Sequence, residues 1–247
     1  MNSAYHRDVL CPTQLGTSSS RQLRGVSPLL VIPLGATEQH GPHLPLDTDT
    51  RIAAAVAAAV VEDLRSAARD EVMLAPAISY GASGEHEGFA GTVSIGTAAL
   101  ELLLVEYGRS ACNWASRLVF VNGHGGNVQA AASAVRLLRS EGRDVGWVPC
   151  FAANADAHAG HTETSVLLHL SPEQVWFDEA VRGNTDSLAE LLPRLRNGGI
   201  VACSELGVLG DPTTATAVEG ERIFAEMVDG CAVRIQGWRP DRNGMLT

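Results

Sequence analysis

The first strong pattern in the chain is an apolar run over residues 29–34, which stops at Gly35. A continuous run of this kind is typical of a strand that is buried on both faces of a sheet. A loop rich in Gly, Pro and His follows, and residues 50–68 then carry strong helix formers. Thr48 or Asp49 is in position to cap that helix. The pattern therefore predicts a strand, a long loop and a helix.

The same alternation of strand and helix signals continues along the rest of the chain. Alternation of this kind predicts a parallel sheet that is covered by helices. We expect one domain over residues 1–247, an α/β fold built as a three-layer αβα sandwich with a mostly parallel sheet. The pattern at 198–209 indicates neither element. The further strands are expected at 72–78, 118–121 and 145–151, and the further helices at 98–114, 128–139, 162–170, 184–196 and 215–234.

The composition is that of an ordinary globular protein, with 45% hydrophobic and 19% charged residues. A net charge of −10 and a pI near 5.2 argue against nucleic acid or an anionic membrane as a partner. The five cysteines form no CxxC pair, so a reducing cytoplasm is expected rather than a disulfide framework. Residues 1–20 lack a secretory pattern, and the longest apolar run, 52–61, falls well short of the roughly 20 residues that span a bilayer.

Carboxylate and imidazole side chains gather in three loops that each follow a predicted strand. Glu38 and His40 lie two residues apart, so in an extended segment both side chains point the same way. In open parallel sheets the loops at the carboxyl ends of the strands converge. The donor set suits two Zn, Mn or Fe ions, with Asp49 as the bridge and with His124 on the ion that Glu38 holds. His40 would hold the other ion, and residues 158–163 would add ligands and a proton donor.

Simpler roles exist for the same residues. Asp49 is equally suited to a helix N-cap, and His124 to a turn, although a structural turn rarely needs an imidazole between glycines. The glycines beside His124 could cradle a phosphate, but the lysine and the spacing of a nucleotide-binding loop are missing. Residues 85–87, Glu-His-Glu, are interpreted as a solvated loop. Structural roles are expected for His43, His161 and His169.

Residues 33–49, Pro-Leu-Gly-Ala-Thr-Glu-Gln-His-Gly-Pro-His-Leu-Pro-Leu-Asp-Thr-Asp, closely resemble the signature of the creatininase family. The resemblance extends over nearly the whole chain through the segments 83–92, 122–127, 158–165 and 207–212. It implies a metal-dependent amidohydrolase with an αβα fold and a homo-oligomeric, commonly hexameric, assembly.

The resemblance also implies a role for each residue that matches the motifs. It makes His158 the proton donor beside the reacting amide, and Ser83 and His86 are expected to position the substrate. Creatininase itself has an acidic ligand where Gly126 stands here, so the second ion needs another partner, and we expect Glu163 to supply it. The implied metal ligands, with Asp49 bridging, are Glu38, His40, Asp49 and His124.

The substrate expectation follows from departures within the family. Creatininase flanks its small planar ring with tryptophans, and residues 151–160 contain none, so creatinine is not the expected substrate. The Gly-Gly form of the histidine motif resembles relatives that act on other amides, among them formamide deformylases of flavin and deazaflavin pathways. Residues 1–6 and 46–51 look most like a peptidase branch, which trims a modified Val-Tyr-derived dipeptide from the carboxyl end of a small precursor peptide. The alternative of another class is a metal- or phosphate-binding subunit without catalysis.

Overall fold

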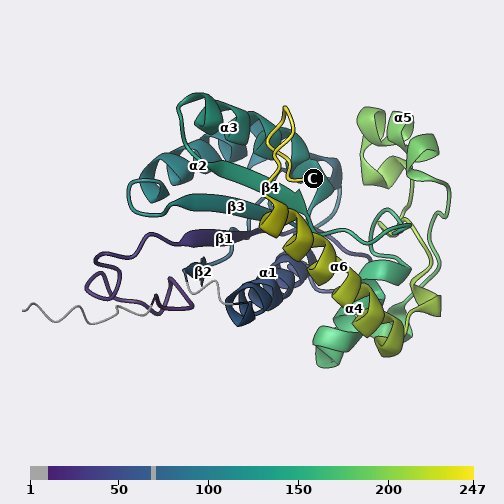
Figure 1. Ribbon diagram of the computed structural model, residues 1–247. Helices are drawn as coiled ribbons and strands as arrows, with labels where there is room; N and C mark the ends of the chain where they lie inside the picture. The colour runs from purple at the N-terminus through teal and green to yellow at the C-terminus, as the bar shows by residue number, and fades with distance from the viewer. Residues whose placement is uncertain (1–10, 68–70) are drawn as a thin grey trace, which may run out of the picture.

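A parallel sheet lies at the centre of the molecule (Figure 1), whose computed structural model describes residues 11–67 and 71–247. The predicted match at residues 1–6 lies outside the described residues. Within these residues the strand order is β2-β1-β3-β4, and every neighbouring pair is parallel. The predicted parallel sheet is confirmed. Its strands are β1 (Leu29–Leu34), β2 (Val72–Leu74), β3 (Arg117–Asn122) and β4 (Val145–Pro149).

Helices cover both faces of this sheet, as Figure 1 shows for α2 and α3 on one side and α1 on the other. Successive strand residues alternate between two cores: Val31 packs with α1, α4 and α6, and Ile32 packs with α2 and α3. The predicted three-layer sandwich is confirmed. None of the helices in the described part of the chain is long and apolar enough to span a bilayer. The helices are α1 (Thr48–Ser66), α2 (Gly96–Ala111), α3 (Val128–Ser140), α4 (His161–Leu170), α5 (Leu188–Gly198) and α6 (Ala217–Gly237).

Two expected boundaries are wrong for local reasons. β2 ends at Leu74 instead of running to 78, because Pro76 has no N–H for the ladder, although Ile78 still donates to Pro33 O at 2.9 Å. α5 begins at Leu188 rather than at 184. The Glu190 carboxylate accepts hydrogen bonds from the backbone N–H and the hydroxyl of Ser187, which fixes the helix start at that residue.

The start of α1 differs from the prediction in a way that matters for the site. The residue that precedes the helix is Asp47, so Thr48 and Asp49 both lie inside the first turn. The Thr48 hydroxyl donates to Pro45 O at 2.7 Å, and the Asp49 side chain is buried. The interpretation of Thr48 or Asp49 as the N-cap is therefore wrong, and the Asp49 carboxylate is available for another role.

α4 and α6 pack closely because Gly220 of α6 faces the backbone of α4. A Cβ atom at position 220 would lie 1.8 Å from Ser165 O. α4 carries Glu163 in its first turn, so this helix crossing also positions a candidate metal ligand. By contrast, a Cβ at Gly230, farther along α6, would meet nothing closer than Arg234 Nη1 at 3.6 Å.

We expect Gly220→Ala to lower the free energy of unfolding by about 1–3 kcal/mol, since the added methyl group forces the two helices apart. Urea titration followed by circular dichroism measures the loss. Gly230→Ala in the same helix is the matched control, and it should be neutral or stabilise by up to about 1 kcal/mol. Equal effects of the two substitutions would contradict this account of the crossing.

Candidate metal centre

The side chains predicted to bind metal come together at the carboxyl ends of the strands, on the side where α4 and α5 lie in Figure 1. The loop after β1 carries Glu38 and His40, and the first turn of α1 adds Asp49. His124 follows β3, and Glu163 lies at the start of α4. These residues are far apart in the sequence, but the fold brings them together because parallel strands end at one edge of the sheet.

Asp49 lies between two histidines and uses a different oxygen for each. Its Oδ1 is 3.1 Å from His40 Nε2, and its Oδ2 is 3.2 Å from His124 Nδ1. On one side Glu38 Oε1 is 3.2 Å from the same His124 nitrogen, and on the other Glu163 Oε2 is 3.9 Å from the same His40 nitrogen. Asp49 therefore belongs to two groups of possible ligands, and within each group the donor atoms lie within 4.8 Å of one another. The first group is Glu38, Asp49 and His124, and the second is His40, Asp49 and Glu163.

The carboxylates of this cluster have polar atoms that no protein donor satisfies. Both oxygens of Glu38 and Oδ2 of Asp49 are buried and accept no hydrogen bond from any residue that the structure describes. Leaving buried carboxylate oxygens unpaired is costly, and the usual remedies are a counter-ion or a coordinated metal. Carboxylate oxygens mixed with imidazole nitrogens are donors that Zn, Mn and Fe accept. The residues present thus fit a pair of divalent cations.

Burial and neighbouring charges shift the pKa values of the side chains in this cluster. Burial raises the pKa of Glu38, and it also raises the pKa of Glu163 to about 7. Burial opposes the charge on Asp49 as well, but the neighbouring imidazoles outweigh it and hold the pKa of that carboxyl below its usual range. Burial likewise works against a charged His40, yet Asp49 raises its pKa to about 10. Glu38 and Asp49 likewise raise the pKa of the buried His124 well above its usual value, so without metal both His40 and His124 pair with the carboxylates.

Two further histidines flank the cluster and stay neutral. Burial, together with His124 and His40, lowers the pKa of His86 to about 3. Burial, together with His40 and His86, lowers the pKa of His158 well below its usual value. The Nδ1 atom of His158 lies 3.9 Å from Glu38 Oε1. A third group of possible ligands, Glu38, His40 and His158, lacks the shared Asp49 carboxylate, which leaves His158 beside the pair of groups rather than within it.

Gln39, which the sequence argument passed over, fixes the tautomers of both flanking histidines. His158 Nε2 lies 2.8 Å from Gln39 O, and because a carbonyl only accepts, Nε2 carries the hydrogen and Nδ1 has the lone pair. The Gln39 side-chain oxygen accepts from Gly41 N at 2.8 Å, so its amide nitrogen is the donor that lies 3.0 Å from His86 Nδ1. The other nitrogen of His86 then carries the hydrogen and lies 3.2 Å from Glu38 Oε1, a close contact without the geometry of a hydrogen bond.

The interpretation of residues 85–87 as a solvated loop is wrong for His86, which is buried. It holds for Glu87, which is exposed. Ser83 is buried too, but its hydroxyl has no hydrogen-bond partner and it does not line the main cavity. His43 donates to or accepts from Thr164 Oγ1 at 2.8 Å, and burial lowers its pKa to about 4.

Gly126 occupies a position where this backbone leaves no room for a side chain. A Cβ there would lie 2.2 Å from Ala82 O and 2.5 Å from His124 Nε2. Glu85 fills the adjacent space, with its Oε1 3.7 Å from the same His124 nitrogen, which faces away from the cluster. No acidic side chain fits at 126 in this backbone, and the group of possible ligands around His40 and Asp49 includes Glu163 but not Glu85.

Asn127 links the loops around the cluster by hydrogen bonds, and it is a second residue whose role the sequence argument missed. Its side-chain oxygen accepts from Ala82 N at 2.9 Å, and its side-chain nitrogen donates to Gly35 O at 3.0 Å. Asn122 fixes the histidine loop itself by donating to His124 O at 2.8 Å. The asparagines at both ends of the Asn-Gly-His-Gly-Gly-Asn motif thus tie together the loops that carry Glu38, His86 and His124.

The cluster opens into a cavity of about 1240 Å³. Asp49, His86, His124, His158 and Glu163 line its floor, and residues of the 151–157 loop and of α5 line its walls. Pockets that enclose a single small ligand usually measure about 300–1,000 Å³. This cavity is therefore larger than a single small planar amide needs.

A family profile for creatininase, described as creatinine amidohydrolase, matches residues 15–235. The chain belongs to the creatininase family. It is thus a metal-dependent hydrolase that acts on C–N bonds, as the motifs implied.

Similar proteins place the chain within that family. It is 72% identical to a mycofactocin precursor peptide peptidase of Mycolicibacterium smegmatis, over the full length of both chains. It is 63% identical to the protein of the same name from Mycobacterium tuberculosis, again over both full lengths. Creatinine amidohydrolase of Pseudomonas putida is 28% identical over 84% of this chain and 88% of that one. The expected resemblance to the peptide-trimming branch is confirmed.

Solved structures agree with the creatininase fold. A crystal structure of creatinine amidohydrolase has a TM-score of 0.76 at 24% identity, covering 93% of this chain and 99% of that one. A structure described as creatininase with Mn has the same TM-score at 25% identity and the same coverage. A mutant creatininase described as the Zn-Zn type has a TM-score of 0.75.

His40 links pH to the stability of the metal-free protein. Its folded-state pKa, about 10, lies above its ordinary value of 6.5, so between these values the folded chain keeps a proton that the unfolded chain releases. The stabilisation should be complete below that ordinary value and be lost as the pH rises through about 10. Urea titrations of the chelator-treated protein across this range measure it.

His40→Gln is the control for this pH dependence, because it removes the titrating group and retains a side chain that can donate to Asp49. The variant should show a flatter dependence of unfolding free energy on pH over the same range. If wild type and variant lose stability with the same slope, a group other than His40 binds the proton.

Proposed function

We propose that this chain is a peptidase that removes the modified, Val-Tyr-derived carboxyl-terminal dipeptide from the mycofactocin precursor. The full-length relatives of that name support the substrate. The observation that carries the chemistry is the pair of ligand groups that share Asp49 at the floor of a large cavity. A peptide substrate requires an open cleft, whereas a creatinine ring does not require one.

The proposed metal ligands divide between two ions. Glu38 and His124 would hold one, His40 and Glu163 would hold the other, and Asp49 would bridge them. A pair of Zn, Fe or Mn ions supplies Lewis acidity in such a site, since it lowers the pKa of a coordinated water and polarises a carbonyl group. His40 must release its proton to become a ligand, so metal binding at neutral pH should liberate protons.

His158 is the proposed acid-base residue. Its Nε2–H is held by Gln39 O, so the lone pair on Nδ1 faces the floor of the cavity. Nδ1 can accept a proton from the attacking water and deliver it to the departing amide nitrogen. Burial lowers the pKa of His158, so the imidazole is neutral and the Nδ1 lone pair is free. A positioned group of this kind contributes roughly 10²–10⁴-fold to the rate.

His86 has a different place in the proposal. It lines the cavity, and its Nε2 lies 3.2 Å from Glu38 Oε1, so it can help to orient that carboxylate while it meets the substrate. Ser83 is proposed as a substrate-positioning residue on the basis of the family motif alone. A homo-oligomer, a hexamer by family resemblance, and a cytoplasmic location complete the proposal, and the five free cysteines suit a reducing compartment.

Glu163→Gln tests the replacement of the missing acidic ligand. We expect the variant to bind one divalent ion per chain where wild type binds two, because a neutral amide is a weak partner for a second cation. Plasma emission spectrometry of the dialysed protein gives the stoichiometry. Glu85→Gln is the matched control: Glu85 lines the same cavity beside His124 but outside the two groups, so this variant should keep both ions. Loss of an ion from the control alone would assign the ligand to Glu85.

His158→Ala separates an enzyme from a binding subunit. Mass spectrometry should show that wild type releases the terminal fragment from the modified precursor peptide and leaves creatinine and formamide substrates intact. The variant should lose about 100-fold or more in turnover and keep its metal content. Wild-type protein that binds two ions and cleaves none of these amides would favour the binding subunit. Cleavage of a formamide alone would favour the deformylase alternative.

A further inference from the structure

α5 stands apart from the sheet and is supported by a small core of its own (Figure 1). Leu191 of α5 is buried there with Ile200, Cys203 and Leu209, and Leu195 packs against them. Leu209 also exchanges backbone hydrogen bonds with His158, at 2.8 and 3.1 Å. The helix is thus held firmly to the rim of the catalytic cavity, although it belongs to neither core of the sandwich.

The apolar stripe of α5 is wider than the part that this small core covers, because Leu188 and Leu192 adjoin Leu191 and Leu195 on the same side of the helix. Leu188 and Leu192 are one helical turn apart, so their side chains lie on the same face. They are 52% and 38% exposed, and both line the cavity. Neither residue is needed to close the small core beneath the helix, since Leu191 does that.

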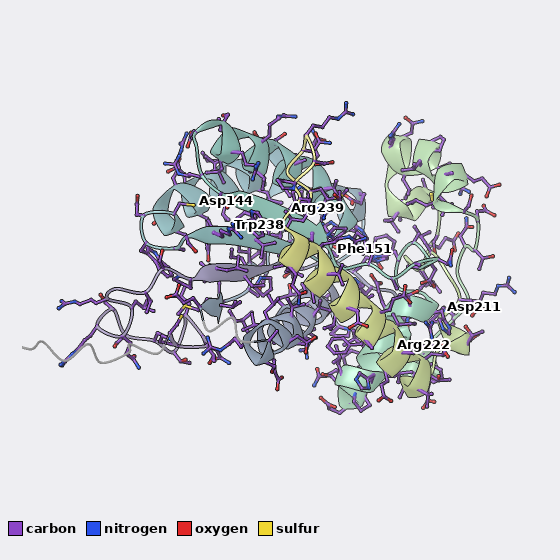
Figure 2. All side chains as sticks on the ribbon, in the orientation of Figure 1. Asp144, Phe151, Asp211, Arg222, Trp238 and Arg239 are labelled. Atoms are coloured by element: carbon purple, nitrogen blue, oxygen red, sulfur yellow. The ribbon has the colours of Figure 1, made fainter. Side chains whose placement is uncertain are left out.

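Phe151 supplies an apolar group on the other wall. It follows β4, as Figure 2 shows, and its side chain is 45% exposed and lines the same cavity. Arg196 lies one turn beyond Leu192 and also lines the cavity, without a hydrogen bond or ion pair to any residue that the structure describes. An unpaired guanidinium beside apolar side chains is a suitable neighbour for the face of an aromatic ring.

We propose that Leu188, Leu192 and Phe151 form a subsite for an aromatic side chain next to the scissile amide, with Arg196 at its edge. The subsite is continuous with the candidate metal centre, because Asp49, His124 and Glu163 line the same cavity. In this assignment a peptide whose amide lies over the cluster would place its neighbouring side chain between α5 and the 151–157 loop, since residues of both line the cavity. This assignment rests on the proposed peptidase function, in which the subsite would bind the tyrosine-derived ring of the substrate.

The test compares metal-loaded wild type with the double variant Leu188→Gln/Leu192→Gln on the modified precursor peptide. We expect kcat/KM to fall about tenfold or more, mainly through KM, since the substitutions remove apolar contact with the bound ring and leave the chemistry in place. Metal content and melting temperature should match wild type, because surface substitutions in a solvent-facing helix have small effects on stability. Leu206→Gln is the matched control: Leu206 is 54% exposed but does not line the cavity, and its KM should stay unchanged.

N-acetyltyramine, which carries the phenol ring on an amide, tests the aromatic assignment without turnover of the precursor. It should inhibit wild type competitively, and its inhibition constant should rise about tenfold in the double variant and in Phe151→Ala. Inhibition that is absent, or equal in all three proteins, would overturn the assignment. An unchanged KM in an active double variant would also overturn it, whereas inactive wild type would refute the proposed function instead. A change in oligomeric state of the double variant would show that a second copy of the chain covers this face.

Discussion

The burial of two carboxylates among imidazoles is the constraint on which this structure depends. Glu38 and Asp49 are almost completely removed from solvent, and three of their four oxygens accept no hydrogen bond from the described residues. Their nearest cationic partners are His40 and His124, which are themselves buried and whose pKa values the carboxylates raise. The ion pair of His40 with Asp49 offsets part of the cost in the metal-free protein. Divalent cations would satisfy the remaining oxygens, and without them the charges of the site are incompletely balanced.

Close approach of backbone segments makes that burial possible. Gly35 follows β1 directly, and a Cβ there would lie 2.4 Å from Thr50 Cα, so the loop could not rest on α1. Gly123 precedes the histidine, and a Cβ there would lie 2.8 Å from Asp49 O. The glycines of these motifs therefore bring α1 and the β3 loop into contact at the point where Asp49 enters the cluster. The asparagine side chain of residue 127 then replaces water as the partner of the loop backbones.

Residue periodicity was enough to predict the sheet and the first candidate ligands. β1 and β3 are buried on both faces, so they appear in the sequence as continuous apolar runs. Glu38 and His40, two residues apart, do reach the same cluster. Gln39 between them meets His86 and His158, and only the fold shows these contacts. His86 was misjudged because glycines and acidic residues surround it in the sequence, and its burial comes from a distant loop. The body of α5 was predicted correctly but its start was not, because the start depends on the hydrogen bonds between Ser187 and Glu190.

The candidate metal centre and the proposed aromatic subsite belong to different structural units of this molecule. The candidate ligands come from the edge of the central sheet and the first turns of α1 and α4, where both large cores restrict every backbone. The apolar wall comes from α5, whose small core shares few residues with the rest. Side chains that face the cavity from α5 can therefore change without disturbing the packing that positions Asp49 and His124. A family that keeps one metal centre can serve different amides in this way, since the wall sets the shape of the substrate while the sheet edge sets the reaction.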